Sequence, residues 1–312
     1  MQKFAFCDGT SDVWQFDTDQ PGLLPYPAHS GGGNIRSLAY TANQQLVFVS
    51  GPSFNSIRKT TGPMSQTVLY TETMPTVYLS RARVRMIGPN EERIYFSSYN
   101  TSQGAEYVGE QIYQIRYLKK QIATNYMTIY PSQLTIPDPC DNGKQMAAYM
   151  SGDFAFGDDD TLYLSTGNIA GGGNVKLKCG IYRIKGAGPD GVTGTIERIY
   201  LGEGPITGLS FRSPKTLYFL RNNDIFKLDL AIKKVSLLAT IPTQPGHWSA
   251  EDLTWVNNGF SQVFWWNLIS FTYKVPIWIS TTVWKMAIAF VLGHAPEPPD
   301  QPRSVQQDIE PN

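Results

Sequence analysis

The sequence carries little charge and no surplus of either sign. Only 17% of its 312 residues are charged, below the roughly 25% of a typical globular domain, and 26 Lys and Arg balance 26 Asp and Glu. A protein that binds a phosphate backbone usually has a basic surplus. We therefore expect no nucleic-acid partner.

Cysteine is scarce, and the common catalytic motifs are missing. The three cysteines, Cys7, Cys140 and Cys179, lie far apart and form no Cys-x-x-Cys pair, which argues against structural zinc. The chain has no Gly-x-Ser-x-Gly motif, and its two glycine-rich stretches open no helix. Nucleophilic catalysis and phosphate-loop chemistry are thus not indicated.

Targeting signals are also absent or weak. The first residues show no apolar core or cleavage site of a signal peptide, so secretion or surface attachment is expected only if residue 1 is a mature or trimmed start. Residues 275–292 are apolar enough to suggest a bilayer span. Lys285 near the middle, Pro276 near the start and many β-branched residues favour strands, so we do not expect a membrane span.

What the sequence does contain is a repeat. Apolar and aromatic segments that end in Ser, Gly or Asn recur roughly every 40–70 residues, close to the length of a four-stranded propeller blade. These segments cover residues 4–9, 46–51, 94–100, 162–168, 217–223 and 263–267. We interpret them as the second strands of six blades.

Alternating apolar and polar residues flank each of these segments, as half-buried strands do. The predicted third strands are residues 13–16, 56–59, 112–115, 181–184, 225–228 and 269–273. The predicted first strands are residues 35–40, 82–87, 152–156, 206–211 and 251–255. The whole pattern is typical of an all-β protein.

The predicted fold is one six-bladed β-propeller domain over residues 1–312. A C-terminal strand completes the blade formed by the N-terminal strands and so removes an open sheet edge. The blades lie near residues 1–28 with 303–312, 34–72, 80–136, 150–203, 205–242 and 249–294. The alternative is five blades, in which residues 251–255 pair with the N-terminal strands; it holds if residues 263–292 are not strands.

The repeat resembles the six-bladed propeller superfamily that includes NHL-repeat, TolB-like and gluconolactonase-like proteins. The most typical stretch is Asp-Asp-Asp-Thr-Leu-Tyr-Leu-Ser-Thr-Gly-Asn at residues 158–168, and the resemblance covers nearly the whole chain in repeat form only. It implies a site over the central channel, on the face where first strands begin and second strands end. We call this the top face.

Two sets of residues are candidates for a site there. First strands begin near Arg36, Arg83, Asp153, Thr207, Glu251 and Asp252. Second strands end near Asp8, Asn55, Asn100, Asn168, Asn222 and Asn267. Glu251, Asp153, Asn100 and Asn168 offer hard oxygen ligands that suit Ca²⁺ or Mg²⁺, and the resemblance to gluconolactonase-like proteins implies a divalent cation in this position. The alternative is that each Asn only ends its strand.

Ligand contacts are expected from Arg36, Arg83 and Trp248 at the same face. Arg81, Arg83 and Arg85 alternate along one strand and either meet an anionic ligand or pair with nearby carboxylates. A second metal hypothesis uses His29, His247 and His294, which all lie between a fourth strand and the next first strand.

The sequence therefore favours a binding propeller that recognises a protein or a glycan through its top-face loops. The alternative function is a lactonase or esterase that depends on a divalent metal held by Glu251, Asp153, Asn100 and Asn168. The sequence does not decide whether the chain is an enzyme, because a fold does not define a function.

Overall fold

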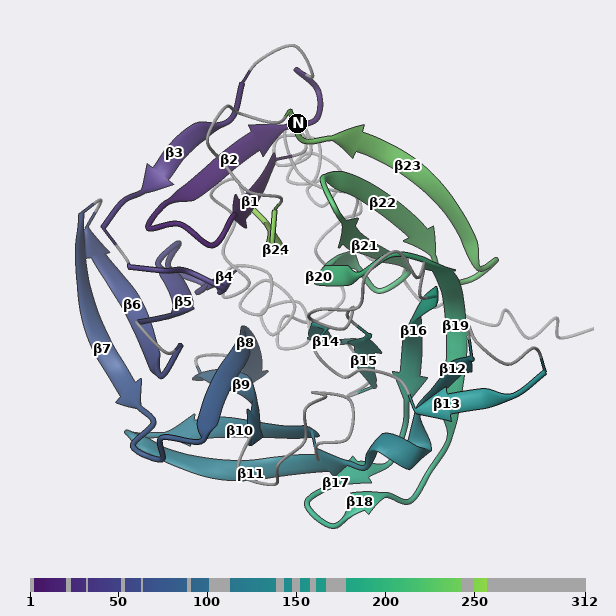
Figure 1. Ribbon diagram of the computed structural model, residues 1–312. Helices are drawn as coiled ribbons and strands as arrows, with labels where there is room; N and C mark the ends of the chain where they lie inside the picture. The colour runs from purple at the N-terminus through teal and green to yellow at the C-terminus, as the bar shows by residue number, and fades with distance from the viewer. Residues whose placement is uncertain are drawn as a thin grey trace, which may run out of the picture. The chain divides into compact units, whose positions relative to one another are not determined.

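A computed structural model shows an all-β chain whose main sheets are arranged in a ring (Figure 1). The residues described are 3–20, 24–31, 33–51, 54–62, 64–88, 91–100, 113–138, 143–147, 152–157, 161–166, 178–242 and 250–256. Within them, no helix is long and apolar enough to cross a membrane.

Five antiparallel sheets of four strands form the blades, and each blade is a simple meander from the centre of the ring outwards. Blade 1 contains β24 (Asp252–Trp255), β1 (Lys3–Cys7), β2 (Val13–Asp17) and β3 (Tyr26–His29). Blade 2 contains β4 (Ser37–Tyr40), β5 (Leu46–Ser50), β6 (Ser56–Gly62) and β7 (Ser65–Thr71). Blade 3 contains β8 (Val77–Gly88), β9 (Glu91–Asn100), β10 (Tyr113–Lys119) and β11 (Ile122–Ile129).

The remaining two blades have the same order. Blade 4 contains β14 (Phe154–Phe156), β15 (Leu162–Ser165), β16 (Lys178–Ile184) and β19 (Ile196–Glu203). Blade 5 contains β20 (Ile206–Ser213), β21 (Thr216–Arg221), β22 (Asp224–Asp229) and β23 (Lys234–Thr240). The predicted first, second and third strands that lie within the described residues are all confirmed, with small shifts at their ends.

Short additional strands lie beside blades 3 and 4. The 3-10 helix η2 (Pro131–Gln133) leads into β12 (Thr135–Pro137), which pairs with β13 (Gln145–Ala147). A second small hairpin joins β17 (Ala187–Gly188) to β18 (Gly191–Val192). Leu134 and Ile136 are buried in the same core cluster as residues of β10, β11, β15 and β16. The first insertion therefore fills the space between these two blades.

The core consists of five apolar clusters, one between each pair of neighbouring blades. The alternation along β1 shows why. Phe4 and Phe6 pack towards blade 5, whereas Ala5 and Cys7 pack towards blade 2. Because each sheet is covered on both faces, its second strand has a run of consecutive apolar residues, as at residues 4–7 and 46–49, rather than a strict alternation.

The ring is closed by β24, so the five-bladed alternative is the arrangement that the described strands form. β24 pairs with β1 through Phe4 with Trp255 and Phe6 with Leu253, and the Phe4 and Trp255 rings meet edge to face at 5.1 Å. Blade 5 then packs directly on blade 1.

The predicted closure of blade 1 by a C-terminal strand must be corrected accordingly, and a sixth blade is not among the described strands. One edge of β1 is paired with β2 and the other with β24, which occupies the position assigned to residues 303–312. The strands predicted at residues 263–292, and residues 303–312 themselves, lie outside the described residues. The assignment of the whole chain to a single domain stays a prediction.

Candidate functional site at the centre of the ring

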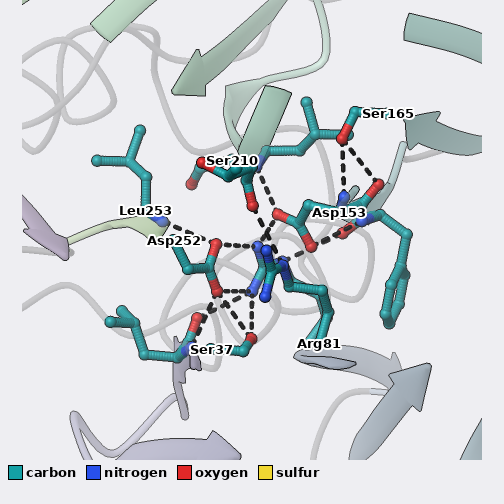
Figure 2. Close-up of polar contacts among 12 residues, drawn as sticks. Ser37, Arg81, Asp153, Ser165, Ser210, Asp252 and Leu253 are labelled. Carbon is teal, nitrogen blue, oxygen red and sulfur yellow. Dashed lines mark hydrogen bonds and ion pairs between the residues drawn. The ribbon is translucent and has the colours of Figure 1, made fainter. Parts of the chain in front are cut away.

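Four charged side chains meet at the centre of the ring. Arg81 and Arg83 are two residues apart on β8, so they project from the same face of that strand. Asp153 and Asp252 stand at the start of the inner strands of blades 4 and 1. All four residues are buried. Figure 2 shows Arg81 and the two aspartates close together, with Ser37 beside Asp252 and Ser165 beside Asp153.

Arg83 bridges the two carboxylates. Its Nη2 forms an ion pair with Asp153 and another with Asp252 Oδ1 at 2.7 Å, and its Nη1 donates to Asp252 Oδ2 at 3.0 Å. The guanidinium also donates to the backbone oxygens of Leu38 and Phe154. One side chain of blade 3 thus holds the inner strands of blades 1, 2 and 4.

Each aspartate also joins its own inner strand to that of the next blade. Asp252 Oδ2 accepts hydrogen bonds from the Leu38 amide at 2.9 Å and from the Ser37 hydroxyl at 2.7 Å, both in blade 2. Asp153 Oδ2 accepts a hydrogen bond from the Leu209 amide in blade 5. The other oxygen of each carboxylate accepts from the following backbone amide, at Phe154 and Leu253.

Arg81 lies among carbonyl groups rather than carboxylates. It donates to the backbone oxygens of Arg36, Thr207 and Glu251 at 3.1, 3.2 and 3.3 Å, and to that of Ser80. These four residues belong to or directly precede the inner strands of blades 2, 5, 1 and 3. Arg81 and Arg83 together therefore contact all five blades.

This arrangement is built for stability more than for chemistry. Two arginines and two aspartates cancel in formal charge, which lowers the cost of burying them. Every oxygen of Asp153 and Asp252 already accepts at least one hydrogen bond. Both carboxylates are therefore engaged by backbone amides and by Arg83 of the chain itself.

The nearby thiol is equally unreactive. Cys7 is fully buried beside this centre, and burial together with the charge of Asp252 raises the pKa of its thiol well above the ordinary value. Burial also raises the pKa of Cys179 to about 11. Because the thiolate is the nucleophilic form, neither residue is suited to covalent catalysis near neutral pH.

The surface above this centre is different in character. Arg36, just before β4, places its guanidinium over the Phe54 ring at 4.5 Å, and both side chains are half-buried. Phe54 has a φ of 48°, in the left-handed region that is rare for a bulky residue. Glu251, just before β24, is also half-buried and approaches Gly9, where an added Cβ would lie 3.1 Å from Glu251 Oε1.

The structure places the predicted site residues as follows. Arg36 and Glu251 lie at the top face, whereas Arg83 and Asp153 are paired with each other beneath it. Trp248 and Asn168 lie outside the described residues, and of Asn100 only the backbone is described, at the end of β9. The Ca²⁺ site therefore stays a prediction, and the described residues contain no group of three His, Cys, Asp or Glu side chains that would hold a metal.

The three-histidine hypothesis is tested at one position only. His29 is buried on β3 with its ring 5.5 Å from that of Phe48, while His247 and His294 lie outside the described residues. The alternating arginines are expected from the sequence to meet an anionic ligand or to pair with carboxylates. Arg83 pairs with carboxylates, whereas the Arg85 guanidinium lies over the Phe156 ring.

Sequence reasoning did not recognise Ser37, Arg81 and Asp252 as parts of one centre. A signal was present, because Asp252-Leu253 and Asp153-Phe154 are acidic-apolar pairs at matching places in two first strands. The repeat pattern does not predict which neighbouring blade each aspartate side chain contacts.

Comparisons with known proteins assign this chain to no family. No protein-family model and no curated protein matches this chain. Among solved structures, a protein of unknown function from Bacteroides caccae is 8% identical with a TM-score of 0.45, covering 82% of this chain and 99% of that one. Virginiamycin B lyase from Staphylococcus aureus is 16% identical with a TM-score of 0.37, over 78% and 68% of the two chains.

A putative gluconolactonase is a further similar structure, 12% identical with a TM-score of 0.40 over 80% of each chain. Likeness at this level says nothing about activity. The resemblance drawn from the repeat is confirmed at the level of the fold: the chain is a β-propeller, with five blades in the part that is described.

Proposed function

We propose that this chain is a binding propeller that recognises a protein or a glycan at its top face. The observation that supports this most strongly is the neutral centre made by Arg81, Arg83, Asp153 and Asp252. Its donors and acceptors are used to hold the inner strands together, so the centre provides a rigid floor rather than reactive groups.

The Arg36–Phe54 pair is the best recognition element on that floor. A guanidinium stacked on an aromatic ring is held in a fixed plane, and its edges suit hydrogen bonding to carboxylates or other acidic groups. The left-handed backbone of Phe54 fits this role, because strain of this kind is retained mostly where a residue has to be positioned for function. We therefore expect a ligand that carries acidic groups.

Binding to arrays of acidic and neutral glycans and of acidic peptides tests the proposal. Arg36→Ala should weaken binding of the best ligand by roughly tenfold, as expected for the loss of a charged hydrogen bond. Arg93→Ala is the matched control, because Arg93 stacks on Tyr117 at 4.7 Å but lies at the start of β9, on the opposite face. Equal losses in the two variants would contradict the proposal.

The hydrolase alternative has a separate readout. Lactone and ester substrates should not be turned over in the presence of Ca²⁺ if the top face only binds. Turnover that Glu251→Gln abolishes without changing the melting temperature would replace the binding proposal with a metal-dependent hydrolase.

A further inference from the structure

The top ends of blades 2, 1 and 5 carry charged side chains of alternating sign. Arg36 precedes β4 in blade 2, Glu251 precedes β24 in blade 1, and Arg221 ends β21 in blade 5. All three side chains are half-buried. The backbone oxygens of Arg36 and Glu251 both accept hydrogen bonds from the Arg81 guanidinium, so these two residues border the same point at the centre of the ring.

The guanidinium in blade 5 is held between neutral partners. Arg221 lies over the Phe226 ring at 4.4 Å, and its Nη1 donates to the Tyr200 hydroxyl at 3.0 Å. Asp224 lies opposite in the register of β21 and β22, but its Oδ1 accepts from the Thr240 hydroxyl at 2.6 Å. Within the described chain no carboxylate pairs with Arg221, so its remaining N–H groups suit the carboxylate of a ligand.

The carboxylate in blade 1 lies among other acidic groups. Glu251 packs against Gly9 in the turn between β1 and β2, and no hydrogen bond or ion pair from the described residues reaches its carboxylate. The same turn contains Asp12, which is half-buried, and Asp8, which is buried and accepts hydrogen bonds from Thr10. The top end of blade 1 is therefore negative and attracts a cationic group.

Neighbouring charged residues at this face leave the pattern unchanged, because they have partners of opposite charge. Glu72, at the end of blade 2, is paired with Arg116. Lys178 and Glu203, at the adjoining end of blade 4, lie opposite each other in the register of β16 and β19. What remains is a stacked guanidinium on each side of the acidic end of blade 1.

We infer that the top face binds a peptide segment of mixed charge, in which a basic residue stands between two acidic ones. The acidic side chains form charge-assisted hydrogen bonds with Arg36 and Arg221, and the basic side chain meets Glu251. This inference rests on the proposed binding function and narrows its ligand to a peptide of one charge pattern.

A peptide fits these three blades better than a glycan does. A short peptide supplies carboxylates and a cation together, whereas an acidic glycan leaves the carboxylate of blade 1 facing further negative charge. Stacking on a sugar also requires an uncovered aromatic face. Each of the two guanidiniums covers the phenylalanine ring beneath it, and the Phe226 ring stacks on Phe219 as well, at 5.1 Å.

A peptide array probed with the full chain tests the charge pattern. Each peptide carries one Lys between two Glu, at spacings that vary along an extended chain of about 3.3 Å per residue. Matched peptides replace the Lys, or both Glu, by Gln. The mixed-charge peptide should bind roughly tenfold more tightly than either, as expected for charged hydrogen bonds. Equal binding after replacement of the Lys, or tighter binding of an oligosaccharide of uronic acids, would overturn the inference.

Substitutions in the protein assign each charge. Glu251→Gln should remove the preference for Lys over Gln in the peptide, and Glu251→Lys should reverse it. Arg221→Gln should weaken binding of the mixed-charge peptide by roughly tenfold. The control is Glu91→Gln with Arg93→Gln, which removes one charge of each sign from the opposite face, where the two side chains pair at 3.1 Å. This control should leave the affinities unchanged.

The outcomes separate this inference from the proposed function. Peptide binding that Arg36→Ala weakens, but that ignores the charges of Glu251 and Arg221, would overturn the mixed-charge pattern and leave the binding function in place. Binding of neither peptides nor glycans would overturn both.

Discussion

At the scale of single residues, Glu72 shows how burial and hydrogen bonding oppose each other at one carboxylate. Burial alone would raise its pKa, but hydrogen bonds from the Met74 amide, Arg116 and Tyr70 outweigh burial and lower the pKa. Tyr70 and Arg116 each donate to Glu72 Oε2 at 2.9 Å. Since Arg116 lies on β10, this carboxylate joins the end of blade 2 to blade 3.

The lowered pKa predicts how stability depends on pH at this contact. A carboxyl group with a lowered folded-state pKa stabilises the protein above its unfolded pKa, near 4.5, and loses that effect as pH falls through the folded value. At pH 7 Glu72→Gln should therefore cost about 1–3 kcal/mol of unfolding free energy. Urea unfolding at several pH values should show this difference shrinking below pH 4.5.

Glu197→Gln is the comparison for that experiment. Glu197 also pairs with basic residues, Arg183 and Lys233, but the pair is exposed to solvent. Exposed ion pairs contribute about 0–1 kcal/mol, so this variant should remain near wild-type stability. The unfolding free energies of wild type and Glu72→Gln are compared down to pH 3, below the ordinary glutamate pKa of about 4.3. A difference between them that stayed constant over this range would contradict the role assigned to the Glu72 carboxylate.

At the scale of elements, Gly208 on β20 marks the closest approach of two blades. A Cβ added there would lie 2.7 Å from the Leu253 amide nitrogen and 2.9 Å from the Leu253 Cβ, so the inner strands of blades 5 and 1 have no room for it. Its φ is not in the left-handed region, so close approach, and not backbone freedom, requires the glycine.

Gly208→Ala should consequently destabilise the protein. Overpacking of this kind costs typically about 1–3 kcal/mol, and thermal unfolding measured by circular dichroism would detect it. Gly188→Ala on β17 is the control, because a Cβ there meets nothing within 4 Å. The same melting temperature for both variants would show that β20 and β24 are able to separate without cost.

The elements also show which parts of the fold are visible in the sequence. The inner strands were predictable, because alternation of apolar and polar residues is a local property and survives in every blade. The hairpins β12–β13 and β17–β18 were not predicted, since strands of two or three residues are too short to show a period. They are defined by what they pack against, as Leu134 and Ile136 illustrate.

At the scale of the whole molecule, closure of the ring depends on β24. This strand supplies Asp252 to the charged centre and Leu253 to the core between blades 5 and 1. Its last contact is the hydrogen bond from the Val256 amide to the Lys3 oxygen at 2.9 Å. Closure therefore joins residues near both ends of the described chain.

Two shortened chains test this account of closure. A chain that ends after residue 249 lacks β24 and leaves Arg83 with one carboxylate, so we expect it to lose cooperative thermal unfolding. A chain that ends after residue 262 retains β24 and should melt within a few degrees of the full chain, about the effect of 1 kcal/mol. Failure of the longer one to fold would show that the ring needs strands beyond β24.

The sequence by itself determined the all-β class, the repeat and the position of nearly every described blade strand. These follow from local alternation and from turn residues, which are set by neighbours along the chain. The tertiary structure decided that the described strands form five blades, because residues 251–255 are equally suitable in sequence as the first strand of a sixth blade or as the closing strand of the first. It also decided that Arg83 pairs with Asp153 and Asp252, because these residues are far apart in the sequence and come into contact only when their strands meet at the centre of the ring.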